Sequence, residues 1–384
     1  MPFYHTLGRI PHKRHTCFRK PDGSLYREEV VGTRGFSGIY SILYHCSAPT
    51  RVIESKLLGS KAVEYCSGLP LEHRHIVTKD FRTSGDPVDS RIFLMGNKDL
   101  RLGLATPDKE MNYFYRNGLC DECLFVHYGS GTLHTQFGKL EYRAGDYIVI
   151  PVGTTYQIKI SENTKFLVIE ANSRFEFPRR YRNEYGQLLE HSPFCERDIR
   201  IPRELETYDE QGEYEVRIKL GDKYSMTILD HHPFDLIGWD GYLYPWIFNI
   251  EDFEPITGRV HQPPPVHQTF EGQGFVVCSF CPRLFDYHPE AIPAPYAHSN
   301  VNSDEVLYYV EGNFMSRKGI DVGSFTLHPA GIPHGPHPGT IEKSIGAKKT
   351  EELAVMVDTF APLQITQTAL DLCDPNYMKS WLGA

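Results

Sequence analysis

The sequence contains no long hydrophobic run and few patterns that would form an amphipathic helix. No apolar stretch approaches the ~20 residues that a membrane-spanning helix needs. Residues 1–15, MPFYHTLGRIPHKRH, also lack the apolar core of a secretory signal peptide. We therefore expect no membrane partner and a cytoplasmic location.

An excess of positive charge is absent as well. Lys and Arg number 40 against 49 Asp and Glu, which gives a net charge of −9. Proteins that bind DNA or RNA gather positive charge to neutralise phosphates, so this balance argues against a nucleic-acid partner. One short basic run, PRRYR at residues 178–182, is better explained by a solvated face or a subunit contact.

Cysteine is present in an odd number, nine, without a signal for secretion. This usage predicts free thiols in a reducing compartment. Two CxxC pairs, Cys120 with Cys123 and Cys278 with Cys281, raise the alternatives of a zinc site or a redox pair. Both pairs lie in strand-like sequence, where residues three apart point to opposite faces. Structural thiols are the interpretation that we favour.

Aromatic residues and turn formers are abundant. The chain has 23 Tyr, 22 Phe, 32 Gly and 27 Pro in 384 residues. Many Tyr and Phe punctuated by Gly and Pro are typical of short strands joined by turns, so an all-β fold is predicted. The pattern divides the chain into an N-terminal β-rich segment, a first barrel, a connecting region, a second barrel and a C-terminal tail, with bounds 1–105, 106–170, 171–255, 256–360 and 361–384.

The two barrels share an internal repeat. The segment GSFTLHPAGIPH at 323–334 matches GDYIVIPVGTTY at 145–156, with Gly, Pro and Gly in register. Upstream of these segments, Glu305 and Glu122 each precede a glycine by seven residues. A repeat of this length predicts two copies of one small β-barrel.

The copies differ at the positions that could bind a metal. The second copy has His298 and His334 where the first has Tyr115 and Tyr156. Alternate side chains of a strand share a face, so the two histidines and Glu305 can converge inside a barrel. Two histidines and one carboxylate form the facial ligand set of non-haem Fe(II), which leaves positions open for O₂ and substrate. We predict a metal site in the second copy and a structural role for the first.

These segments carry a family pattern. The stretch HSNVNSDEVLYYVEG at 298–312 resembles the first cupin motif, with Asn300 in place of its second histidine, and GSFTLHPAGIPH resembles the second motif. With RKPDGSLYREEVVG near the N-terminus and PPPVHQTFEG at 263–272, the chain resembles the homogentisate 1,2-dioxygenase family in its shorter, bacterial-type form. The resemblance implies two cupin barrels in tandem, each a jelly roll or double-stranded β-helix. It also implies a homo-oligomer, either a trimer or a hexamer.

The resemblance further implies roles for individual residues. Fe(2+) would be bound by His298, Glu305 and His334, and His261 would be the catalytic acid/base near the substrate. Substrate contacts would come from Asn300, His328, Phe314 and Tyr296, with Phe314 standing where longer family members carry a tyrosine. The pair His73-x-His75 has ligand-like spacing but no matching carboxylate motif, and we expect it at the surface.

The implied reaction is oxidation of a small aromatic dihydroxy acid by O₂. On homogentisate, the ring would open to give maleylacetoacetate, a step of tyrosine and phenylalanine catabolism. Phe314 leaves gentisate or another hydroquinone-type acid as an alternative substrate. A cupin isomerase that uses Zn or Mn, and a non-enzymatic bicupin, are the alternatives from other classes.

Overall fold

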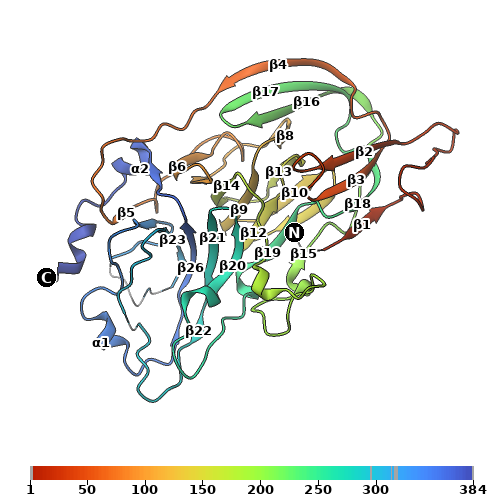
Figure 1. The fold of residues 1–384 in the computed structure, drawn as a ribbon. Coiled ribbons are helices and arrows are strands. Elements are labelled where there is room, and N and C mark those ends of the chain that lie inside the picture. The colour runs from red at the N-terminus through yellow and green to blue at the C-terminus, as the bar shows by residue number, and fades with distance from the viewer. Residues whose placement is uncertain (1–2, 295, 313, 315–318, 383–384) are drawn as a thin grey trace.

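The computed structural model describes residues 3–294, 296–312, 314 and 319–382, and it is an all-β protein with tandem cupin barrels. Figure 1 shows the two barrels side by side, with the strands of the second barrel from β20 to β26 in teal to blue. Within the described part, the α-helices are two five-residue elements, α1 (Thr340–Ser344) and α2 (Gln367–Asp371). No helix among these residues is long and apolar enough to cross a membrane.

The first barrel is formed by two sheets that face each other. A seven-stranded sheet has the order β11-β10-β13-β8-β16-β17-β4, and an eight-stranded sheet has the order β15-β19-β12-β9-β14-β7-β6-β27. The bounds of the first are β11 (Gly138–Tyr142), β10 (Gly131–Thr135), β13 (Thr155–Ile160), β8 (Phe114–Asn117), β16 (Gln211–Leu220), β17 (Lys223–His231) and β4 (Val52–Ser60). Those of the second are β15 (Ile199–Arg200), β19 (Trp246–Asn249), β12 (Asp146–Ile150), β9 (Asp121–Tyr128), β14 (Lys165–Ala171), β7 (Leu100–Ala105), β6 (Ile92–Gly96) and β27 (Gln364–Ile365).

The eight-stranded sheet is the middle layer of the molecule, and both of its faces are buried. On β9, Leu124 and Val126 point into the first barrel, whereas Cys123 and Phe125 belong to a larger core shared with the second barrel. This is why β9 is almost continuously apolar instead of alternating, as strands buried on both faces are.

The second barrel contributes a six-stranded sheet with the order β20-β21-β26-β23-β24-β5. Its strands are β20 (Gln268–Gly272), β21 (Phe275–Phe280), β26 (Leu353–Thr359), β23 (Asp304–Glu311), β24 (Phe325–His328) and β5 (Arg74–Ile76), and a small ladder joins β22 (Arg283–Leu284) to β25 (Lys349–Thr350). Val306, Tyr308 and Val357 face the shared core. The alternate positions, beginning with Glu305, therefore face the opposite side.

The N-terminal segment is distributed over several sheets. A four-stranded sheet has the order β1-β18-β3-β2, while β4, β5 and β6 join three other sheets. The strands of the four-stranded sheet are β1 (His5–Gly8), β18 (Leu236–Gly241), β3 (Tyr40–His45) and β2 (Arg27–Gly32). The domain boundaries given above stay predictions.

Short 3₁₀ turns complete the described structure. They lie at Arg179–Tyr181, Glu196–Asp198, Ile250–Asp252, Pro264–His267 and Tyr377–Leu382. The last of these turns lies at the C-terminal end of the described chain, which runs beside the second barrel in Figure 1.

The glycines of the repeat have the same physical role in both barrels. Gly129 and Gly312 both have left-handed backbones, with φ of 100° and 96°. A Cβ on Gly312 would lie 2.2 Å from the carbonyl oxygen of Glu351, and one on Gly129 would lie 2.3 Å from the Thr164 hydroxyl. Only glycine combines this conformation with such close approach.

Candidate metal centre

Glu305 is held by the regular part of the second barrel. It lies at the start of β23, opposite His328 on β24 and Asp358 on β26. Because side chains alternate along a strand, Leu307 and Tyr309 point to the same side as Glu305. The carboxylate therefore lies at one end of a largely apolar face.

The two histidines come from irregular segments that are bridged to each other. The backbone N–H of His298 donates to the carbonyl of His334 at 2.7 Å, and the reverse bond is 2.9 Å long. Their ring centroids are 4.3 Å apart. The Pro–Ala–Gly turn after β24, in which Gly331 has φ of 87°, directs the chain back so that His334 reaches its partner.

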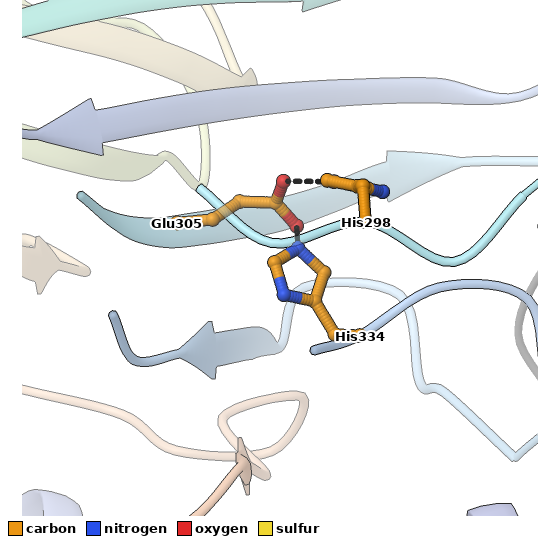
Figure 2. A group of neighbouring side chains, drawn as sticks. All are labelled: His298, Glu305 and His334. Carbon is orange, nitrogen blue, oxygen red and sulfur yellow. Dashed lines mark ion pairs between the residues drawn. The ribbon is translucent and has the colours of Figure 1, made fainter. Parts of the chain in front are cut away.

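The three side chains converge around one point, as Figure 2 shows. Nε2 of His298 is 3.5 Å from one carboxylate oxygen of Glu305, and Nε2 of His334 is 3.3 Å from the other. One ligand atom from each residue lies within 4.8 Å of the others. The structure thus brings together the three residues that the sequence pattern selected.

The histidines have nitrogen atoms that need a partner. His334 is 3% exposed, yet its Nδ1 has no hydrogen-bond partner among the described residues, and the same is true of Nδ1 of His298. Nε2 of His334 has only the 3.3 Å ion-pair contact with Glu305, without hydrogen-bond geometry. An unsatisfied buried polar atom costs about 1–3 kcal/mol. A divalent cation between the rings and Glu305 would accept a lone pair from each ring and remove part of that cost. Two imidazoles and one carboxylate suit Fe(II) as well as Zn²⁺.

The charge state of Glu305 also suits a cation. Burial alone would raise its pKa, but the imidazoles of His298, His328 and His334 approach closely enough to hold the pKa well below its ordinary value. The side chain is therefore a carboxylate at neutral pH, the form that binds metals.

His328 lies behind Glu305. It is fully buried, and its Nδ1 is 2.8 Å from Oε1 of Glu305. Its Nε2 is 3.1 Å from the hydroxyl of Tyr377, in the C-terminal 3₁₀ turn. The sequence pattern alone gave no indication of Tyr377.

His261 and Tyr296 lie together on the other side of His298. Nε2 of His261 is 2.8 Å from the Tyr296 hydroxyl, and the Tyr296 ring is 6.0 Å from the ring of His298. Nδ1 of His261 is 3.6 Å from a carboxylate oxygen of Asp286. Asn300 is half-buried, and its backbone carbonyl accepts from the N–H of Ser303. His261 and Tyr296 form a partly exposed side of the site.

Phe314 lies on the apolar side. Its ring is buried 4.4 Å from that of Tyr309, in a cluster that also includes Leu307 and Phe280. Leu307 and Tyr309 share the face of Glu305, so this cluster continues from the carboxylate along the sheet.

The prediction for His73 and His75 was wrong. Both side chains are buried, at 5% and 2% exposure, because β5 adds to the edge of the six-stranded sheet beside β24. Nε2 of His73 is 3.2 Å from the carbonyl oxygen of Pro333, next to His334. The pairing joins segments about 250 residues apart, and no local pattern indicates it.

The four cysteines of the two CxxC pairs do not belong to the candidate ligand group among the described residues. All four thiols are buried, and all nine cysteines of the chain are free. Burial raises the pKa of Cys120 and of Cys281 to about 12. Thiols that stay protonated at neutral pH are poor nucleophiles and poor zinc ligands.

The corresponding position of the first barrel is filled by protein groups. Tyr115 and Tyr156 are paired across β8 and β13, and both hydroxyls approach Glu122. Arg91 completes the cluster, with Nη1 2.6 Å from Glu122 and Nη2 3.0 Å from the Tyr156 hydroxyl. The guanidinium takes the role of counter-ion for the buried carboxylate.

Comparison with known families covers most of the chain. A family model for the N-terminal part of homogentisate 1,2-dioxygenase matches residues 95–250, and one for its C-terminal part matches residues 259–384. A presumed dioxygenase of Saccharolobus solfataricus is 44% identical over 384 residues, which are 99% of each chain.

Named homogentisate 1,2-dioxygenases are more distant. The mouse enzyme is 26% identical over 72% of this chain and 65% of its own length, and the human enzyme is 25% identical over 73% and 66%. The alignment therefore spans about two-thirds of those enzymes.

Similarity to solved structures is slight. A cupin 2 conserved barrel protein from Leptotrichia buccalis has a TM-score of 0.31 at 11% identity, covering 81% of this chain and 98% of that one. An oxalate decarboxylase from Bacillus subtilis has a TM-score of 0.35 at 12% identity, covering 77% and 79%. Scores this low carry no inference about function.

Proposed function

The chain belongs to the homogentisate 1,2-dioxygenase family, and from that premise we propose that it is an Fe(II)-dependent dioxygenase that opens the aromatic ring of homogentisate to give maleylacetoacetate. The observation that carries the proposal is the convergence of His298, Glu305 and His334 at one end of an apolar face. Homo-oligomerisation as a trimer or hexamer is part of the same proposal.

The ligand set suits Fe(II), and the family to which the chain belongs makes Fe(II) the metal that we propose. Two neutral imidazoles and one carboxylate leave a bound Fe(II) with net positive charge and open positions for O₂ and a ring hydroxyl. When bound, iron supplies the activation of O₂ and eases deprotonation of that hydroxyl. His298, Glu305 and His334 hold the ion, and the surrounding side chains bind and orient the substrate.

The apolar face supports an aromatic substrate. Phe280, Leu307, Tyr309 and Phe314 form one cluster on the side to which Glu305 points. A planar ring next to these side chains would be desolvated, which strengthens the electrostatic interactions of its hydroxyl groups. Phe314 contributes surface without a hydroxyl, and this favours gentisate or another hydroquinone-type acid as the second candidate substrate.

The partly exposed side supports a proton carrier. An imidazole side chain can both accept and donate a proton near neutral pH. The Tyr296 hydroxyl and the Asp286 carboxylate orient the ring of His261. We assign it the transfer of the proton from the second ring hydroxyl. General acid/base help of this kind is worth roughly 10²–10⁴-fold in rate. Asn300, Tyr296 and His328 complete the proposed substrate environment, with His328 acting through Glu305.

The test is oxygen uptake by Fe(II)-loaded protein, followed together with the ring-opened product. One O₂ consumed per homogentisate, lost in His334→Ala and kept in His134→Ala, would support the proposal, since His134 lies on β10 of the first barrel. Uptake with gentisate alone would keep the iron site and replace the substrate. Substrate loss without oxygen uptake in Zn- or Mn-loaded protein would indicate an isomerase. No oxygen uptake with any dihydroxyaromatic acid would contradict the assignment as a dioxygenase.

A further inference from the structure

The C-terminal end of the described chain is fixed against the second barrel. The N–H of Asp374 donates to the carbonyl of His75, and the N–H of Val77 donates to that of Leu372, both at 2.8 Å. The 3₁₀ turn Tyr377–Leu382 follows directly and packs on β5. Residues at the end of the sequence thus reach the buried side of the metal centre.

Tyr377 begins a chain of hydrogen bonds that ends at a proposed metal ligand. Its hydroxyl is 3.1 Å from Nε2 of His328, whose Nδ1 is 2.8 Å from Oε1 of Glu305. Tyr377 is 3% exposed and His328 is fully buried, so water does not compete for either bond. Two successive hydrogen bonds therefore link the C-terminal turn to the carboxylate.

The direction of each bond follows from the donor inventory. An ionised carboxylate can only accept, so Nδ1 of His328 carries a hydrogen and donates it to Glu305. A neutral imidazole then has a lone pair at Nε2, which accepts the phenolic O–H of Tyr377. The tyrosine hydroxyl selects the tautomer that Glu305 requires.

We propose that Tyr377 is a positioning residue of the metal centre, which acts through the tautomer and ring orientation of His328 to fix the Glu305 carboxylate. The inference rests on the proposed function in one respect, because it takes Glu305 as a metal ligand. Groups that orient a metal ligand in this way typically contribute 10–100-fold to metal affinity or activity.

The same turn also holds the segment that carries His334. Nε1 of Trp381 donates to the carbonyl of Gly335 at 3.1 Å, and its ring lies 4.5 Å from that of His337. One short element thus contacts both ligand-bearing parts of the second barrel. Apolar packing alone would require neither the phenolic hydroxyl nor the indole N–H.

The test compares Tyr377→Phe with a matched variant. Tyr147→Phe also removes the hydroxyl of a fully buried tyrosine, but that hydroxyl is 2.9 Å from Oγ of Ser279, on the shared core. The dissociation constants of Fe(II) and Co(II) would be measured by competition with a chelator, together with the ligand-field absorption of the Co(II) protein. We expect Tyr377→Phe to weaken metal binding about tenfold and to change the Co(II) bands, and Tyr147→Phe to do neither.

A double-mutant cycle tests the route through His328. In the His328→Leu background, Tyr377→Phe should cause no further loss of metal affinity, because the imidazole that connects the hydroxyl to Glu305 is gone. Equal losses in both backgrounds would overturn the inference, and so would a Tyr377→Phe protein with wild-type affinity and Co(II) bands.

Failure of the proposed function can be distinguished from failure of this inference. Because the experiment measures metal binding, the role of Tyr377 can still be determined if the protein binds Fe(II) but turns over no dihydroxyaromatic acid. Wild-type protein that binds no metal at Glu305 would overturn the proposed function and this inference together, before any variant is compared.

Discussion

The two barrels place the same constellation in different chemical surroundings. In both, a glutamate from one sheet faces a backbone-bridged pair of ring side chains, Tyr115 with Tyr156 in the first and His298 with His334 in the second. In the first barrel the carboxylate of Glu122 is neutralised by a guanidinium from the same chain. In the second, the groups facing Glu305 are imidazoles with nitrogen atoms that lack hydrogen-bond partners among the described residues.

The difference indicates what converts this scaffold from a metal centre into a structural core. A buried carboxylate needs a positive partner, and the need is met either by a bound cation or by a basic side chain. Arg91 is always charged and cannot leave, so the first barrel is stable without a metal but has no open position for chemistry. Under the proposed function, the second barrel would take a cation from solution and thereby gain a reactive site.

The largest contrast should come from changing the polar ring side chain at the matching position of each barrel. We expect His334→Ala to lower Fe(II) affinity by more than roughly 100-fold, because loss of a ligand exceeds the usual effect of its neighbours. Tyr156→Phe, which removes the hydroxyl at the matching position of the first barrel, should leave the affinity unchanged. Isothermal titration of both variants checks this, and a metal affinity that depends on Tyr156 would break the comparison.

The next largest effect concerns the stability of the fold, and we expect it in the first barrel. Arg91→Met removes the guanidinium and leaves Glu122 buried without its counter-ion, which should cost about 3–5 kcal/mol of unfolding free energy. The metal content should not change. Denaturant unfolding and metal analysis of the purified variant are the measurements, and a stable Arg91→Met protein with less metal would contradict the assigned roles.

A double variant sharpens that result. Arg91→Met combined with Glu122→Leu removes both charges, and replacing a buried ion pair with apolar groups is often close to neutral. We expect the double variant to be more stable than Arg91→Met alone by at least about 1 kcal/mol. If it is less stable, the two residues do not act as a pair.

The smallest effect is on the pH dependence of stability. Burial by itself raises the pKa of Glu122, but the charge of Arg91, together with hydrogen bonds from Tyr156 and Asn117, holds the pKa below its ordinary value. A lowered folded-state pKa contributes stability that is present above the unfolded value, about 4.3, and is lost as the pH falls below it. The advantage of wild type over Glu122→Gln, measured by thermal unfolding, should therefore shrink from pH 6 to pH 3. An advantage that grows toward pH 3 would contradict the sign.

Much of this comparison can be predicted from the sequence, because the repeat is local. The alignment of Gly145–Tyr156 with Gly323–His334 indicates which residues correspond. The histidines of the second copy identify it as the one that could bind a metal. Strand-like composition and the family resemblance give the all-β tandem barrel. Alternation along a strand accounts for the inward direction of Glu305 on β23. His298 and His334 lie in irregular segments outside the strands, and their bridge to each other brings them to Glu305.

What the sequence does not indicate depends on contacts between distant segments. Arg91 lies outside both motifs, and only the fold brings it to Glu122. His73 and Tyr377 reach the second barrel from opposite ends of the chain, through the β5–β24 pairing and the C-terminal turn. The segment around Tyr377, NYMKSW, carries no ligand motif, so nothing in the local sequence connects it to the metal centre.

The most direct test of the account is the position of iron in crystals of the Fe(II)-loaded protein, located by anomalous scattering on both sides of the iron absorption edge. The account predicts one peak per chain, between His298, Glu305 and His334, and no peak beside Glu122. A peak next to Arg91 and Glu122, or none at Glu305, would contradict it.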